Sequence, residues 1–140
     1  LQEAKARGLS VGLHSGLRSI ADQNKLYELG RSVANPDGQT EANPMGNIVT
    51  KTIGGFSWHN YGLAADIVYR NPGWTWEMPY AKWEELGNVG EMFGIEWGGR
   101  WTRFPDLPHF QLRGNLKNNR LGELRKIAVE KAIEAVWALI

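Results

Sequence analysis

Two short segments of this 140-residue chain carry two of its three histidines, each accompanied by an aspartate. The first segment holds His59 and Asp66, and the second holds Asp106 and His109. Two imidazoles and one carboxylate, with one further acid close by, are the groups that a catalytic zinc site uses. In such a site three protein groups bind the metal and a fourth position is left open for water. The fold has to bring these two segments together, and this requirement constrains it more than any other feature of the sequence.

Composition limits the remaining choices. Hydrophobic residues make up 42% of the chain and charged residues 22%, which is normal for one globular domain. The net charge of +1 does not indicate a nucleic-acid partner, and no apolar run approaches the ~20 residues of a membrane span. The chain has no cysteine, so any metal must be held by His, Asp or Glu. We therefore expect residues 1–140 to form a single, monomeric catalytic domain, with residues 113–140 as a C-terminal extension.

The order of predicted elements favours an α+β fold. Turn and cap signals predict helices that end at Gly8, run from a Ser19 cap to Gly30, and run from Pro79 to Gly94. Apolar alternation predicts strands at residues 10–14, 63–69, 95–97 and 109–112, and a last amphipathic helix spans residues 121–140. Residues 31–55 hold Pro and Gly turn pairs at 35–36, 37–38, 43–44 and 54–55, and predict a long loop. We expect a small antiparallel sheet with helices on one face and the site on the other.

The candidate ligands have a physical rationale beyond their residue types. Asp66 lies within an otherwise apolar strand, where a carboxylate is costly unless it is paired or bound to metal. His59 precedes it on a turn, and Pro108 stiffens the approach to His109. Asp106 is then placed to move a proton, and Arg18, just after the first strand, to bind a carboxylate or an oxyanion. His14 has no partner motif, and we leave it out of the site.

The chain resembles the zinc peptidases of the D-Ala-D-Ala carboxypeptidase and VanY type, most closely their L-alanyl-D-glutamate endopeptidase branch of endolysins and autolysins. The resemblance covers residues ~10 to 112 and is carried by Ser57-x-His59-x-x-Gly62-x-Ala64-x-Asp66, by Asp106-x-Pro108-His109-Phe110-Gln111, and by an opening block around Ser15-Gly-Leu-Arg18-Ser. It implies one catalytic zinc ion held by His59, Asp66 and His109. It also implies that Asp106 is the general base and acid, that Arg18 stabilises the substrate or the tetrahedral intermediate, and that Ser57 and Gln23 support a ligand or the substrate.

The implied substrate is the peptidoglycan stem peptide, cut between L-Ala and D-Glu at the cell wall or in the periplasm by a phage-encoded or secreted enzyme. No signal peptide precedes Leu1, which does not indicate cytoplasmic residence. Three alternatives stay open: a D-Ala-D-Ala-type carboxypeptidase of the same fold, a non-haem iron oxygenase using the same triad, and a non-catalytic wall-binding module whose tryptophans form a sugar platform.

Two further features have a structural and a functional interpretation. The seven tryptophans fit a core better than a sugar or peptide groove. The C-terminal segment combines an apolar side with an excess of basic residues, so it could touch an anionic membrane, although packing on the domain is the favoured interpretation. The basic residues are Arg113, Lys117, Arg120, Arg125, Lys126 and Lys131.

Overall fold

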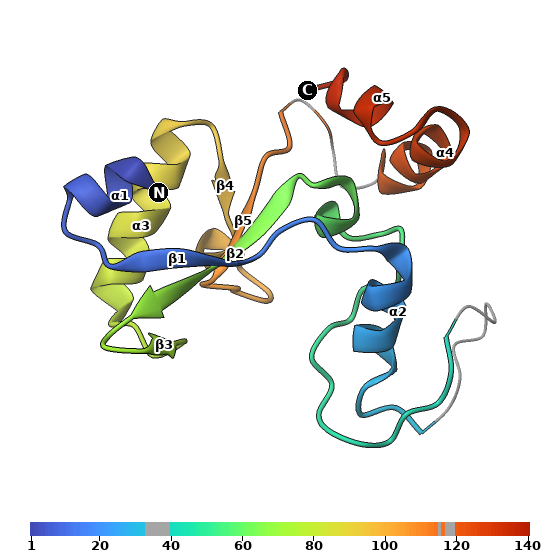
Figure 1. Ribbon diagram of the computed structural model, residues 1–140, viewed down its shortest axis with the longest axis horizontal. Coiled ribbons are helices and arrows are strands. Elements are labelled where there is room, and N and C mark those ends of the chain that lie inside the picture. The colour runs from blue at the N-terminus through green and yellow to red at the C-terminus, as the bar shows by residue number, and fades with distance from the viewer. Residues whose placement is uncertain (33–39, 115, 117–119) are drawn as a thin grey trace. The chain divides into compact units, whose positions relative to one another are not determined.

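The computed structural model describes residues 1–32, 40–114, 116 and 120–140 of the chain (Figure 1). The chain divides into two compact units. Unit 1 comprises Leu1–Gly16 and Leu63–Leu116, and unit 2 comprises Leu17–Gly62 and Lys117–Ile140. The expectation of a single catalytic domain with a C-terminal extension stays a prediction.

Unit 1 is built on a five-stranded antiparallel sheet in the order β1-β2-β5-β4, with β3 paired to β2 (Figure 1). The strands are β1 (Val11–Ser15), β2 (Ala64–Arg70), β3 (Trp74–Thr75), β4 (Glu96–Trp97) and β5 (His109–Gln111). The helices of this unit are α1 (Gln2–Ala6), α3 (Tyr80–Met92) and the short 3-10 helix η2 (Gly98–Arg100). The predicted α+β class with a small antiparallel sheet is therefore confirmed, and β3 is the strand that the sequence pattern missed.

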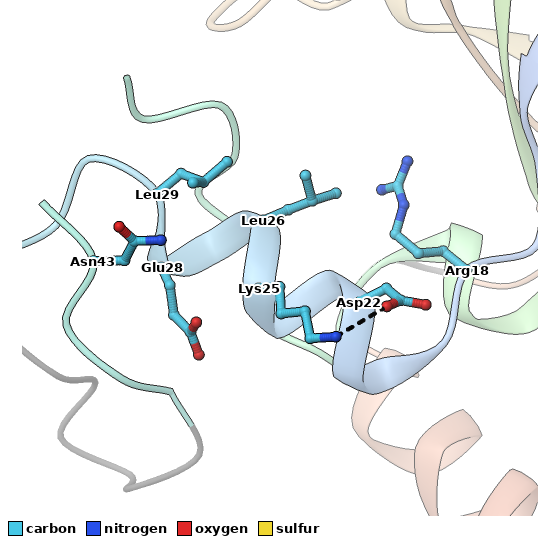
Figure 2. Close-up of a pocket in the computed structure, with 7 residues that line it drawn as sticks. All are labelled: Arg18, Asp22, Lys25, Leu26, Glu28, Leu29 and Asn43. Atoms are coloured by element: carbon cyan, nitrogen blue, oxygen red, sulfur yellow. Dashed lines mark ion pairs between the residues drawn. The ribbon is translucent and has the colours of Figure 1, made fainter. Parts of the chain in front are cut away.

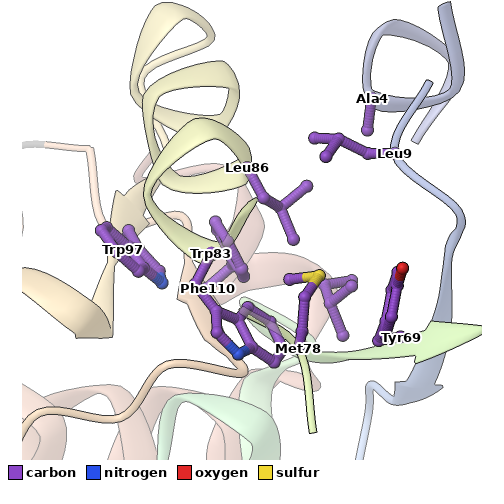
Figure 3. Packing of buried hydrophobic residues seen from close by; sticks show 9 residues of the cluster. Ala4, Leu9, Tyr69, Met78, Trp83, Leu86, Trp97 and Phe110 are labelled. Carbon is purple, nitrogen blue, oxygen red and sulfur yellow. The ribbon is translucent and has the colours of Figure 1, made fainter. Parts of the chain in front are cut away.

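The core of unit 1 lies between one face of this sheet and the two α-helices. Ala4 of α1 and Trp83 of α3 pack with Ile67 of β2 and Phe110 of β5 in one hydrophobic cluster (Figure 3). Trp97 is fully buried there, and its Nε1 donates a hydrogen bond to Leu107 O at 2.8 Å. Burying a side chain of this size contributes roughly 2–3 kcal/mol at about 25 cal/mol per Å² of apolar surface, so this cluster fixes the sheet on which the site is built.

Side chains alternate between the two faces of β2. Ile67 and Tyr69 belong to the core cluster, so Asp66 and Val68 point to the opposite face of the sheet. Asp66 is paired across the ladder with His109 of β5, while Phe110, the next residue in that strand, joins the core. The helices thus cover one face of the sheet and the candidate ligands Asp66 and His109 lie on the other, as the sequence predicts.

Unit 2 contains α2 (Ile20–Glu28), the 3-10 helix η1 (Trp58–Tyr61), α4 (Leu121–Lys131) and α5 (Glu134–Trp137). Ser19 caps α2 as predicted, because its Oγ accepts a hydrogen bond from Asp22 N at 3.0 Å. The helix ends at Glu28, and Gly30, two residues later, has a φ of +73° in the left-handed region that favours glycine. In the described part of residues 31–55 no helix or strand forms beyond isolated bridges, so the predicted loop is confirmed there. The turn pairs predicted at 35–36 and 37–38 lie outside the described residues.

The C-terminal segment differs from the prediction. Instead of one helix over residues 121–140, α4 and α5 are separated at Ala132, which has a φ of 71° that a right-handed helix cannot contain. Leu124 and Val136 are fully buried, and Trp137 Nε1 donates to Tyr61 O at 2.6 Å, so the segment packs within unit 2. Of the basic residues expected along it, Lys117 lies outside the described residues. Among the described helices, none combines the length and apolar character needed to cross a membrane.

Candidate metal and catalytic site

The pairing of β2 with β5 sets two of the candidate ligands side by side. Asp66 and His109 are direct partners in the antiparallel ladder, and His109 Nδ1 lies 3.3 Å from Asp66 Oδ1. His109 is only 8% exposed. Since directly opposed residues on one face of a sheet have Cβ atoms about 5 Å apart, strand register alone is enough to bring these two side chains together.

The carboxylate of Asp66 is held from a second strand. Ser15 Oγ donates a hydrogen bond to Asp66 Oδ2 at 2.5 Å. The register between β1 and β2 shifts between Leu13 and Ser15, which is a β-bulge, and Ser15 rather than His14 stands opposite Asp66. The hydroxyl therefore holds one carboxylate oxygen while the other faces His109. These two contacts account for an acid inside an apolar strand.

The second ring nitrogen of His109 is fixed by Gln111. His109 Nε2 lies 3.0 Å from Gln111 Oε1, and Gln111 is 2% exposed. The amide oxygen only accepts hydrogen bonds, so Nε2 carries the ring proton, and Nδ1, which faces Asp66, is the nitrogen whose lone pair can bind a metal in the neutral ring. A metal-binding histidine usually donates its other N–H in this way, which sets its orientation.

The charge state of His109 reflects two opposing effects. Burial by itself lowers the pKa of the ring, but the hydrogen bonds with Asp66 and Gln111 and the charges of Asp66 and Asp106 outweigh it. The pKa of His109 is therefore raised above its ordinary value of 6.5. The negative charges of Asp66 and Asp106 favour a positive charge near the ring, and they would favour a bound metal ion for the same reason that they favour the proton.

His59 is presented by η1, immediately before β2. Ser57 caps this 3-10 helix, accepting a hydrogen bond from His59 N on its Oγ, and the side chain of Asn60 completes a capping box. Gly62, with a φ of 67°, ends the helix and turns the chain toward β2. His59 is 4% exposed, and its backbone oxygen accepts from Arg18 N at 2.9 Å.

These elements assemble the predicted ligand set. One ligand atom from each of His59, Asp66 and His109 lies within 4.8 Å of the other two. Two neutral imidazoles and one carboxylate form a donor set that zinc accepts in catalytic sites, where three protein groups bind and a fourth position is left for water or substrate. The residues present therefore fit a zinc ion, with the hydroxyl of Ser15 and the amide of Gln111 as supports of the ligands.

Asp106 lies in the tight turn that leads into β5. His109 N donates to Asp106 O at 3.2 Å, and Asp106 N donates to Gly98 O at 3.0 Å. A Cβ at Gly98 would lie 2.6 Å from Asp106 O, so glycine is required for the close approach of η2 to this turn. The Asp106 side chain is exposed, and its charge contributes to the raised pKa of His109. The turn thus places the carboxylate near His109 and in contact with solvent, and its catalytic role stays a prediction.

Arg18 and Gln23 are brought together within unit 2. Arg18 Nη1 donates to Gln23 Oε1 at 2.9 Å, and the buried Gln23 uses its Nε2 to donate to Thr52 O at 2.7 Å. Arg18 also lies at one end of a cavity of about 490 Å³ along α2, shown in Figure 2. The remaining lining residues are Asp22, Lys25, Leu26, Glu28, Leu29 and Asn43. The amide thus holds the guanidinium in place, and the catalytic role of Arg18 stays a prediction.

Sequence reasoning missed the residues that support the ligands. Asn60 Nδ2 donates to Arg18 O at 3.0 Å and its Oδ1 accepts from Gly55 N at 2.8 Å, so one amide links the loop, the helix and the start of α2. Ser15 and Gln111 each bind a ligand side chain directly. Two signals could have identified Gln111: it shares a strand face with His109, and it stands in the motif that carries the family resemblance.

Comparison with known proteins agrees with this site. A family profile described as D-alanyl-D-alanine carboxypeptidase matches residues 50–112, the range that holds the three ligand candidates and Asp106. The peptidoglycan L-alanyl-D-glutamate endopeptidase CwlK of Bacillus subtilis (strain 168) is 36% identical over 121 residues, which cover 80% of this chain and 66% of that protein.

Solved structures show the same fold. The L-Ala D-Glu endopeptidase ChiX of Serratia marcescens is 25% identical, with a TM-score of 0.50 over 74% of this chain and 67% of that one. The D,D-pentapeptidase VanY from the VanB-type vancomycin resistance cassette, solved with Zn(II), is 18% identical, with a TM-score of 0.55 over 89% of this chain and 71% of that one. The chain spans about two thirds of the length of CwlK and ChiX. On the sequence match, the fold and the His/Asp/His cluster, the chain belongs to the M15 family of peptidases, of the D-alanyl-D-alanine carboxypeptidase type.

Proposed function

We propose that this chain is a zinc peptidase that hydrolyses the L-Ala–D-Glu bond of peptidoglycan stem peptides and acts at the cell wall. The observation that carries the proposal is the cluster of His59, Asp66 and His109, whose ligand atoms lie within 4.8 Å of one another. The choice of bond rests on the similarity to CwlK and ChiX, both of which are named as L-alanyl-D-glutamate endopeptidases.

We propose His59, Asp66 and His109 as the zinc ligands. A zinc ion held by them would lower the pKa of a coordinated water to about 7 and polarise the scissile carbonyl. The protein fixes the orientation of the carboxylate ligand and the tautomer of the histidine ligand. Ser15 keeps Asp66 oriented by its 2.5 Å hydrogen bond, and Gln111 keeps the ring proton of His109 on Nε2. Preorganised ligands avoid the cost of ordering them at the moment of binding.

We propose Asp106 as the group that moves protons. Its carboxylate is exposed and stands three residues before His109 in a turn fixed by the Gly98 contact, so it can accept a proton from the attacking water. The same carboxyl group can then donate that proton to the amine nitrogen of D-Glu as the peptide bond breaks. General acid–base catalysis of this kind is worth roughly 10²–10⁴-fold in rate.

The remaining predicted residues have positioning or substrate roles in this proposal. The guanidinium of Arg18, held by Gln23, supplies a fixed positive charge for a substrate carboxylate or for the oxyanion of the tetrahedral intermediate. D-Glu carries such a carboxylate. Ser57 acts through the backbone, because its hydroxyl caps the helix that presents His59.

The test is a digest of purified peptidoglycan, read by mass spectrometry of the released fragments, with a chelator and with zinc added back. The proposal expects new L-Ala carboxyl ends and new D-Glu amino ends, lost with the chelator and restored by zinc. Release of free D-Ala would assign the chain to the carboxypeptidase branch instead. No cleavage by a folded, zinc-loaded sample would contradict the peptidase proposal.

The variant Asp106→Asn separates catalysis from binding. It should retain one zinc ion per chain, because Asp106 is not among the three clustered ligands, and should lose roughly 10²–10⁴-fold in rate. Glu130→Gln, an exposed acid on α4, is the matched control and should keep the full rate. Unchanged hydrolysis by Asp106→Asn would remove Asp106 from the mechanism, and a wall-binding module would show no hydrolysis by any variant.

A further inference from the structure

A group of exposed aromatic side chains lies on the same face of the sheet as Asp66 and His109. Along β2, residues 66, 68 and 70 alternate with the core residues Ile67 and Tyr69, so Arg70 shares the face of Asp66. Trp74 of β3 is the ladder partner of Arg70. The face that carries the ligands therefore continues across β2 onto the β2–β3 hairpin.

We call His14, Trp74 and Trp76 the aromatic platform. Trp74 is 55% exposed and Trp76 is 49% exposed. The His14 ring meets the Trp76 ring edge to face, with centroids 4.7 Å apart. Trp74 and Trp76 thus stand two residues apart in the chain with about half of each side chain exposed. An exposed group of large aromatic rings that are held in place indicates a binding surface more than single scattered apolar residues do.

The platform is held in place although it is not buried. A Cβ at Gly12 would lie 3.0 Å from Trp74 Cη2, so the indole lies directly against the glycine of β1. The Arg70 guanidinium covers the ring, with Cζ 4.6 Å from its centroid. Next to Trp76 the backbone is anchored by Met78, a residue of the core cluster whose N donates to Trp76 O at 3.1 Å. Rigid amphipathic rings lose little conformational entropy on binding, which makes them efficient contact groups.

The platform is continuous with the ligand set. The bulge in β1 turns both His14 and Ser15 toward the face of Asp66: Ser15 binds the carboxylate, and His14 contacts Trp76. Trp74, the third member of the platform, pairs with Arg70, four residues along β2 from Asp66. At about 3.3 Å per strand residue this is roughly 13 Å.

We infer that the aromatic platform binds a sugar ring of the glycan strand to which the stem peptide is attached. This inference rests on the proposed function. In peptidoglycan the L-Ala amine is linked through a lactyl group to the muramic acid ring, so one amino acid and one lactyl unit separate the scissile carbonyl from the sugar. At roughly 3.5 Å per unit of extended chain, the pyranose begins about 7 Å from the scissile carbonyl, and the ring itself extends toward the roughly 13 Å that separate Asp66 from Arg70 along β2.

The chemistry of the platform suits this occupant. The C–H faces of a pyranose are apolar and pack flat on an indole, while the ring hydroxyls remain in contact with water at the edges. A second stem-peptide segment would instead call for backbone hydrogen-bond donors and acceptors, and the half-exposed rings of Trp74 and Trp76 offer mainly apolar area. The enzyme should therefore prefer stem peptides still joined to glycan over free peptides of the same sequence.

The test compares kcat/KM on two substrates, a muramyl-linked stem peptide and the free peptide beginning with L-Ala. Trp76→Ala should lower the value for the muramyl-linked substrate roughly ten-fold more than for the free one, the effect expected for loss of one stacking ring. Trp76→Phe, which keeps a flat ring, should retain most of the preference. Phe93→Ala removes an aromatic that is 62% exposed at the C-cap of α3; it is the control and should leave the ratio unchanged.

An equal loss on both substrates would assign Trp76 to folding or to peptide binding and would overturn the inference. A wild-type enzyme that cuts both substrates equally well, with no change in Trp76→Ala, would overturn it while leaving the peptidase proposal intact. Failure of the wild type to cut either substrate would instead contradict the proposed function itself. Circular dichroism of each variant identifies any that do not fold, and Trp76→Phe then decides.

Discussion

Replacing Gln111 with leucine should uncouple zinc affinity from stability. Gln111 Oε1 accepts the proton of the buried His109 Nε2 at 3.0 Å, and at 2% exposure no water replaces it. Gln111 Nε2, in contrast, has no hydrogen-bond partner among the described residues. Gln111→Leu therefore removes the hydrogen bond from His109 Nε2 and, at the same time, the buried amide NH₂ group that has no acceptor.

The two effects on folding nearly cancel. Leaving the His109 N–H unpaired costs about 1–3 kcal/mol, and deleting a buried unpaired amide group returns about the same amount. The free energy of unfolding without metal should therefore change by only about 1 kcal/mol. Zinc affinity should fall roughly 10–100-fold, about 1.4–2.8 kcal/mol, because the ring of His109 loses the acceptor that fixes its tautomer and orientation.

Three measurements check this reasoning. Chelator competition gives the zinc affinity, denaturant unfolding in chelator gives the stability, and imidazole ¹⁵N shifts report which nitrogen of His109 carries the proton. Gln111→Glu keeps an acceptor oxygen and should retain zinc affinity, although its buried charge should lower stability. If Gln111→Leu bound zinc as tightly as the wild type, or left the His109 tautomer unchanged, the argument that Gln111 orients the ligand would be wrong.

Three further predictions concern packing and pH. Gly87→Ala should destabilise unit 1 by about 1–3 kcal/mol or more in denaturant unfolding, because the added Cβ would lie 2.1 Å from the Trp97 ring. The control is Gly122→Ala in α4, whose added Cβ would meet nothing closer than 3.9 Å and which should leave stability unchanged or raise it. Burial raises the pKa of Tyr61 from 10.0 to about 12, so stability should be full below pH 10 and fall toward pH 12, and Tyr61→Phe should remove this alkaline loss. Because the pKa of His109 is raised, its contribution to the stability of the metal-free protein should be fully present below pH 6.5 and should be lost as the pH rises through the folded-state pKa. Zinc affinity should rise over the same pH range. Denaturant unfolding and chelator competition at a series of pH values measure the two trends.

The sequence predicted the elements whose signals are local. Gly30 and Gly94 have positive φ where their helices were expected to end, and Ser19 caps α2 as its spacing to Asp22 indicated. The grouping of Asp66 with His109 was also predicted, from their residue types and the motif that they share with the family, and the register of β2 and β5 places them as direct partners. These features depend on a few neighbouring residues, which is the information that a single sequence carries most directly.

Features set by tertiary contacts were not predictable. The two-residue strand β3 is too short for a periodic pattern and forms because Trp74 packs on Gly12, a residue far away in sequence. The break between α4 and α5 falls at Ala132, where the sequence has no glycine or proline that would predict the end of a helix. Ser15 and Gln111 have ordinary surroundings in the sequence, and their roles follow only from the bulge in β1 and the register of β5.

The bulge in β1 also bears on how this strand can evolve. Before the bulge, Val11 and Leu13 pair in regular register with Tyr69 and Ile67 of β2. After it, the register is shifted by one residue, so that Ser15 and not His14 pairs with Asp66. Deleting His14 would restore a uniform ladder with Ser15 still opposite Asp66, but it would remove the ring that contacts Trp76, whereas one residue inserted between Leu13 and Ser15 would move Ser15 out of register with the carboxylate it binds. Alignments of related chains should therefore contain substitutions in this segment but no insertions, and any deletion should coincide with loss of the aromatic contact to Trp76.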